Sequence, residues 1–135
     1  MAVSVLVDTG FLVAFLSRRD AHHSWAVAHG PQYPPPWTTC EAVLAESFHL
    51  VGMRGWPRVD ALLRRGALVP AFDLAGELER GLDLMKKYTD VPMSLADACL
   101  VRMSETIADP VVLTTDTDFR VYRRHSRHVV PCVTP

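Results

Sequence analysis

Acidic residues at the ends of two apolar segments are the part of this sequence most able to do chemistry. Asp8 directly follows the β-branched run Val3–Val7, and Asp116 closely follows the run Val111–Leu113. Carboxylates that converge in a partly dry site repel one another, and a hard divalent cation with oxygen ligands relieves the repulsion. A bound Mg²⁺ or Mn²⁺ can activate water against a phosphodiester. These residues therefore suggest metal-dependent hydrolysis.

Two further acids, Glu46 and Asp97, lie on predicted helices whose first turns can face the same place. Each acid also has a structural interpretation. Asp97 stands three residues after Ser94 and can complete a capping box, whereas Glu46 lies in mid-helix and can simply be solvated. Asp8 and Asp116 can cap the helices that follow them. The four acids together, at strand ends and near helix starts, favour a shared site.

The elements that must position these acids alternate between strand and helix. Apolar runs and β-branched residues predict strands at 3–7, 37–38, 68–69, 111–113 and 128–130. Helical spacing predicts helices at 11–19, 22–29, 40–51, 58–65, 74–88, 94–106 and 119–123. This alternation predicts a three-layer α/β/α sandwich around a mainly parallel sheet. In such folds ligands bind beyond the carboxyl ends of the strands, where Asp8 and Asp116 fall.

The chain shows no break long enough to separate two domains. The proline-rich stretch 31–36 is a connector into the second strand, and Gly52 and Gly55 end the helix that begins at Cys40. A length of 135 residues is typical of one domain. We therefore expect residues 1–135 to form a single domain.

Composition indicates a cytoplasmic protein and does not identify a partner. The net charge of −1 arises from 14 basic and 15 acidic residues, so no global positive field points to nucleic acid. The cysteines Cys40, Cys99 and Cys132 lack zinc-site spacing and are expected to be buried, reduced thiols. No segment approaches the ~20 apolar residues that span a bilayer. The adjacent pair His22–His23 points about 100° apart on a helix, which makes it a poor joint metal ligand.

Four segments taken together resemble the PIN-domain family. They are VLVDTGFLVAFL, TTCEAVLAESFHL, LADACLV and TTDTDF, in this order and spacing. The likeness covers essentially the whole chain and is strongest to the small bacterial VapC-like toxins. It implies a Mg²⁺- or Mn²⁺-dependent endoribonuclease that hydrolyses RNA to a 5′-phosphate and a 3′-hydroxyl. It also implies a homodimer that is neutralised by a partner antitoxin.

The resemblance also implies which acids act. It assigns the catalytic and metal-binding roles to Asp8, Glu46, Asp97 and Asp116. The family's glutamate follows an apolar run, which selects Glu46, but Glu41 opens the same helix on a different face and stays a rival. Asp118 is a plausible additional metal ligand.

An RNA substrate also requires cations near the acidic site. The densest basic cluster follows Asp116, and we favour it for phosphate contacts over the other candidates. The cluster is Arg120, Arg123, Arg124 and Arg127; the others are Arg18–Arg19, Arg54, Arg58, Arg64–Arg65 and Lys86–Lys87. Trp25, Phe48, Trp56 and Leu62 are candidates for an antitoxin groove or dimer face, and equally for the core.

Two alternative functions are consistent with parts of the sequence. A HAD-like phosphatase also places an aspartate after a strand, but its chemistry requires a second aspartate two residues later, where this chain has Gly10. A catalytically inactive PIN-like RNA-binding or scaffold module is the other alternative. The presence of all four acids favours the enzyme.

Overall fold

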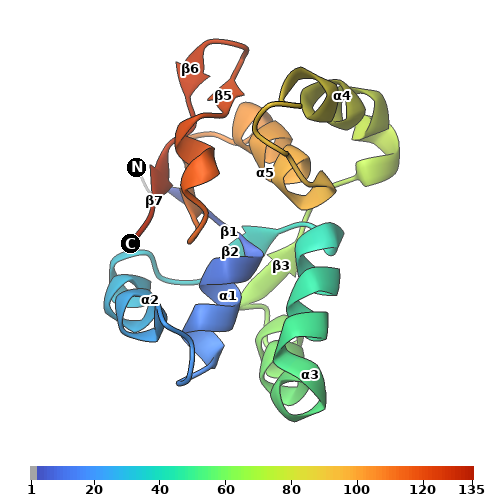
Figure 1. Cartoon of the computed structure of the whole chain (residues 1–135). Helices are drawn as coiled ribbons and strands as arrows, with labels where there is room; N and C mark the ends of the chain where they lie inside the picture. The colour runs from blue at the N-terminus through green and yellow to red at the C-terminus, as the bar shows by residue number, and fades with distance from the viewer. Residues whose placement is uncertain (1–2) are drawn as a thin grey trace.

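Five parallel strands form the central sheet of residues 3–135, the part of the chain that this computed structural model describes (Figure 1). The strand order is β3-β2-β1-β4-β7, and every neighbouring pair is parallel. The strands are β1 (Ser4–Val7), β2 (Trp37–Thr39), β3 (Leu68–Pro70), β4 (Pro110–Leu113) and β7 (Cys132–Val133). This sheet and its covering helices confirm the predicted α/β sandwich.

Helices pack on both sides of the sheet. In Figure 1, α4 and α5 lie together on one side of the strands, and α1 and α2 lie on the other. The helices are α1 (Thr9–Leu16), α2 (His23–His29), α3 (Glu41–Arg64), α4 (Leu74–Lys87) and α5 (Leu95–Thr106), with 3₁₀ turns η1 (Gly30–Gln32) and η2 (Thr117–Arg120). Among residues 3–135, none of these helices is long and apolar enough to cross a membrane.

The centre of the sheet is the place where the chain changes direction. From β1, the chain adds β2 and β3 on one side and returns later to add β4 and β7 on the other. The strands β1 and β4 are paired along their whole length, from Ser4 opposite Pro110 to Val7 opposite Leu113. Such a switch point leaves a crevice beyond the carboxyl ends of the two strands, where ligands bind in open α/β sheets.

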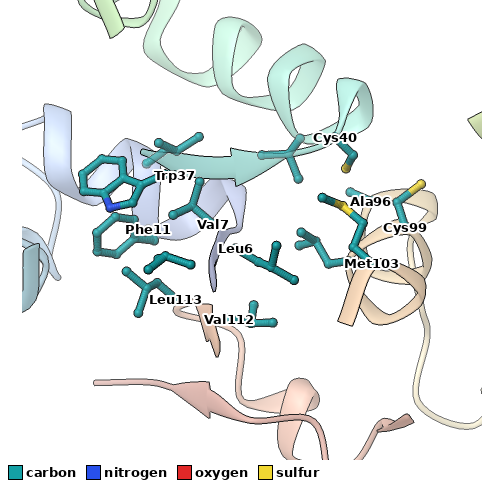
Figure 2. Close-up of a cluster of buried hydrophobic side chains, with 14 of the residues drawn as sticks. Leu6, Val7, Phe11, Trp37, Cys40, Ala96, Cys99, Met103, Val112 and Leu113 are labelled. Carbon is teal, nitrogen blue, oxygen red and sulfur yellow. The ribbon is translucent and has the colours of Figure 1, made fainter. Parts of the chain in front are cut away.

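Side chains of the central strands are buried on both faces of the sheet, as a continuous apolar strand requires. Figure 2 shows Leu6 on the side of Met103 from α5, and Val7 on the side of Phe11 from α1. The rings of Phe11 and Trp37 meet edge-to-face, with centroids 5.2 Å apart. Because the layers on both sides are packed, β1 and β4 are held firmly, and so are the residues that follow them.

The long helix α3 confirms one part of a prediction and corrects another. A break was expected at Gly52 and Gly55, with a new helix from Arg58. The break is present at Gly52, where φ is 66° and ψ is −171° and two helical segments meet at a kink. Pro57 lies inside the second segment, which therefore begins earlier than predicted. A positive φ is a conformation that glycine adopts without steric cost, which explains why the kink is at this residue.

The C-terminal region corrects two more predictions. The helix expected at 119–123 is the 3₁₀ turn η2, which begins at Thr117. The strand expected at 128–130 is part of a small antiparallel hairpin of β5 (Arg123–Arg124) and β6 (His128–Val129). The strand that completes the main sheet is β7, which was not predicted. These strands are only two residues long, so their pairing partners determine them and local sequence pattern does not.

Candidate metal centre

A buried threonine connects the two aspartates that follow β1 and β4. The Thr114 hydroxyl donates a hydrogen bond to Asp8 Oδ2 at 2.7 Å, and it accepts one from the backbone N–H of Asp116 at 2.9 Å. The other Asp8 oxygen, Oδ1, accepts from the backbone N–H of Thr9 at 2.8 Å, which caps α1. Asp8 is therefore both a helix cap and one partner in a bridge between the two central strands.

The turns after the two strands lie in direct contact. A Cβ atom added at Gly10 would lie 2.0 Å from the Thr115 hydroxyl oxygen, so a larger residue does not fit there without displacing that turn. Gly10 is thus required by close approach of the two segments. The absence of a side chain at this position allows the turns that carry Asp8 and Asp116 to lie side by side.

Asp97 lies near these two aspartates and belongs to α5. Its backbone and carboxylate form a capping box with Ser94, as the spacing predicted. Its Oδ2 atom also accepts a hydrogen bond from the Tyr122 hydroxyl at 3.1 Å. Only 8% of Asp97 is exposed, so this acid is a helix cap and a buried carboxylate at once. Capping and a functional role do not exclude each other here.

The carboxylates influence one another electrostatically. The pKa of Asp8 is raised from 3.8 to about 6, and burial is the largest cause. The hydrogen bonds from Thr114 and Thr9 oppose this rise, and the negative charges of Asp97 and Asp116 contribute to it. Burial is also the main cause that raises the pKa of Asp97, and the charge of Asp116 adds to it. The three aspartates therefore occupy one electrostatic site, although they come from β1, α5 and the segment after β4.

Two further acids lie at the margin of this site. Asp118 donates its backbone N–H to Asp116 Oδ1 at 2.9 Å, and its own pKa is raised by partial burial and by the neighbouring Asp116. Glu46 Oε2 accepts a hydrogen bond from the Thr9 hydroxyl at 3.2 Å, one residue from Asp8. Glu41 is exposed and makes no hydrogen bond or ion pair with residues 3–135. Glu46 therefore contacts the residue that follows Asp8, and Glu41 makes no such hydrogen bond within residues 3–135.

The donor set fits a hard divalent cation. Carboxylate oxygens are the ligands that Mg²⁺ and Mn²⁺ prefer, and the charges that raise the pKa of Asp8 are those that a cation would neutralise. Within residues 3–135, no three His, Cys, Asp or Glu side chains are grouped as direct ligands of one ion. The carboxylates instead accept hydrogen bonds from chain donors, as Asp8 does from Thr9 and Thr114. The case for a divalent cation at this site therefore rests on the preference of such ions for carboxylate oxygens and on the repulsion between the carboxylates.

The sequence analysis did not identify Thr114 and Tyr122, which hold the aspartates in place. Thr114 is fully buried and directly follows β4, so its position at a strand end was the available signal. Tyr122 is also fully buried, and its contact with Asp97 joins segments that are 25 residues apart. No local pattern indicates such a contact.

The other chemically active residues have structural roles. The ring of His23 bonds through Nδ1 to the carbonyl of Ala14 at 2.7 Å, which agrees with a packing role for the histidine pair. The three cysteines are free, as expected; Cys40 and Cys99 are buried and Cys132 is partly exposed.

Comparisons with known proteins identify the family and the fold. The sequence profile of the PIN domain matches residues 5–124, and the chain therefore belongs to the PIN-domain family. Among solved structures, the fold is similar to that of VapC20 from Mycobacterium tuberculosis, which is described as a sarcin-ricin loop cleaving toxin. The TM-score is 0.79 at 23% sequence identity, over 87% of this chain and 94% of that one. No curated protein sequence matches.

The raised pKa of Asp8 predicts a stability effect with a defined pH range. The folded chain binds a proton more tightly than the unfolded chain, so stability falls as the pH rises from about 4 to about 6. In a chelator, Asp8→Asn is expected to be more stable than wild type at pH 8, by at most about 3 kcal/mol, and similar to it below pH 4. Urea unfolding at both pH values measures this. The exposed control Asp90→Asn should show no such difference, and equal stability of Asp8→Asn and wild type at pH 8 would contradict the assignment.

The Thr114 bridge predicts a second stability effect. Thr114→Val keeps the shape of the side chain but leaves the carboxylate of Asp8 and the N–H of Asp116 without their shared partner. Leaving buried polar groups unsatisfied should lower the free energy of unfolding by about 1–3 kcal/mol. Thr114→Ser keeps the hydroxyl and should retain more of that stability. If the valine and serine variants unfold at the same urea concentration, the hydroxyl does not stabilise the site.

Proposed function

We propose that this chain is a Mg²⁺- or Mn²⁺-dependent endoribonuclease. The observation that carries the proposal is the raised pKa of the buried carboxylates of Asp8 and Asp97, to which the neighbouring charge of Asp116 contributes in both cases. Membership of the PIN-domain family supports it, because the resemblance in sequence implies that activity. The ligand position expected for an open α/β sheet supports it as well.

The roles of the residues follow from their contacts. Asp8, Asp97 and Asp116 would hold the cation, and Asp118 would add an oxygen at the margin. A bound divalent cation supplies Lewis acidity and lowers the pKa of a coordinated water. Glu46, which Thr9 holds beside Asp8, would orient the attacking water through its carboxylate.

The remaining contacts keep two of these carboxylates in place. Thr114 fixes Asp8 through a hydrogen bond, and Tyr122 fixes Asp97 in the same way. Hydrolysis by this site leaves a 5′-phosphate and a 3′-hydroxyl and needs no histidine.

We further propose that the protein is the toxin of a toxin–antitoxin pair, acting in the cytoplasm as a homodimer. The fold shared with VapC20 supports the toxin role. Exposed apolar side chains on α3 support a protein partner, because a free surface rarely retains several of them: Leu50, Met53 and Trp56 are 61%, 83% and 40% exposed. Of the four apolar residues considered from sequence, Leu62 is buried in the core and Trp56 stays on the surface.

The metal mechanism predicts that RNA cleavage requires Mg²⁺ or Mn²⁺ and stops in EDTA. Asp116→Asn should lower cleavage by at least about 100-fold, because even groups that only support metal ligands contribute about 10–100-fold. The control Asp90→Asn should cleave like wild type. Gel assays of RNA cleavage with each variant measure this. Undiminished cleavage in EDTA would exclude the metal mechanism, and RNA binding without cleavage in any metal would favour the scaffold alternative.

The position of Glu46 predicts how the two rival glutamates differ. Glu46→Gln removes a carboxylate beside Asp8 and should lower the cleavage rate by roughly 10–100-fold. Glu41→Gln, on the same helix, should leave the rate unchanged, because Glu41 has no contact with the aspartates. Single-turnover cleavage rates of both variants decide between them. A larger loss in Glu41→Gln would reverse the assignment.

A further inference from the structure

Four arginines surround a cavity between the end of α1 and the second half of α3. The cavity has a volume of about 350 Å³, and its charged members are Arg18, Arg19, Arg54 and Arg58. Apolar side chains from both helices complete the lining, among them Val13, Leu16, Leu50 and Val51. We call this cavity the arginine pocket.

The positive charge of the arginine pocket is not balanced by the chain. Ion pairs within residues 3–135 involve Arg64 and Arg102, and none involves an arginine of the pocket. One of the four, Arg58, is held in place by donating to the carbonyl of Leu16 at 2.5 Å. Four exposed guanidinium groups without carboxylate partners repel one another, and a ligand with several negative charges would relieve that repulsion. The pocket therefore has the character of an anion site.

Two of the four arginines in the basic cluster that the sequence favoured for phosphate contacts are engaged within the fold. Arg123 donates to the carbonyls of Arg120, Val121 and Tyr122, and Arg120 donates to the hydroxyl of Thr134. These hydrogen bonds hold the C-terminal segment in place. Arg120 and Arg123 thus use their donors within residues 3–135, whereas only Arg58 of the arginine pocket does so. This difference favours the arginine pocket as the site for an external anion.

The kink in α3 shapes the arginine pocket. The positive φ of Gly52 separates the helical segment with Glu46 from the segment with Arg54 and Arg58. At Gly55, which lines the pocket, an added Cβ would lie 2.5 Å from the Val51 Cβ, so the absence of a side chain allows the tight packing here.

The arginine pocket and the carboxylates lie along the same pair of helices. The start of α1 carries Thr9 beside Glu46 of α3, and the later parts of both helices line the pocket. Arg54 is eight residues beyond Glu46 and on the far side of the kink at Gly52, so the arginine pocket and Glu46 belong to different parts of α3.

We propose that the arginine pocket binds a backbone phosphate of the RNA strand, away from the bond that is cut. The inference rests on the proposed nuclease function and adds a second point of attachment to it. Guanidinium groups match phosphate oxygens with paired hydrogen bonds, and such contacts position a strand without reading its sequence. An RNA strand also carries negative charge at regular intervals, so one strand can reach both the carboxylate site and the arginine pocket. A single acidic side chain cannot do this.

The experiment compares two variants that each lower the net charge by two units. Arg18→Gln/Arg54→Gln changes the arginine pocket and spares Arg58, which bonds to the chain. Arg80→Glu changes one exposed residue of α4 and is the control. Binding of a fluorescent single-stranded RNA of about ten nucleotides is titrated at several salt concentrations in the Asp8→Asn background. Cleavage of the same RNA and of a dinucleotide is measured with the same variants in a protein that retains Asp8.

The proposal predicts a specific pattern of results. The slope of log K against log salt should fall by about 0.7 in the pocket variant, since the loss of one phosphate contact on a single strand accounts for about that much. The KM for the longer RNA should rise with kcat unchanged, while dinucleotide cleavage is unaffected because a dinucleotide does not reach the pocket. The control variant should keep the wild-type slope and KM.

Three outcomes would overturn the proposal, and they are distinguishable. If wild type cleaves RNA and the pocket variant keeps its slope and KM, the pocket does not bind RNA and an acidic protein segment becomes the better ligand. If the salt slope and KM of the control variant change as much as those of the pocket variant, the effect comes from the overall charge of the protein and not from the arginine pocket. If wild type neither binds nor cleaves RNA in any metal, the nuclease function itself is wrong, and this inference is wrong with it.

Discussion

The hydrogen bonds of the Thr114 hydroxyl are the interaction on which the candidate site depends. One hydroxyl bonds the carboxylate that follows β1 and the N–H of the aspartate that follows β4, so the ends of the two central strands are held in one geometry. The packed layers on both faces of the sheet keep Thr114 fully buried. In that environment a hydrogen bond that is not formed is costly, which makes the arrangement rigid.

The candidate site is built from residues that also maintain the fold. Asp8 caps α1 and Asp97 completes the capping box of α5, yet both carboxylates lie in the electrostatic site. Burial and mutual repulsion raise the pKa of both acids, which makes the metal-free site unfavourable at neutral pH. A cation would relieve that strain. The same groups thus link local helix capping to the chemistry that we propose.

A net charge near zero conceals a marked separation of charge in this protein. The aspartates gather beyond the ends of β1 and β4, whereas four arginines without carboxylate partners in residues 3–135 gather farther along α1 and α3. The kink at Gly52 separates these two halves of α3. Local fields of opposite sign can therefore coexist on one small surface.

The sequence by itself determined the alternation of elements, the positions of Asp8 and Asp116 at strand ends and the capping box of Asp97, because local patterns encode these features. It did not predict β7 or the contact of Tyr122 with Asp97, and it left Glu46 and Glu41 as rivals. Only the tertiary structure placed Thr9 against Glu46 and four distant arginines around one cavity. The physical reason is that these contacts join segments far apart in the chain, and no short-range periodicity records which segments the packing of helices on the sheet will bring together.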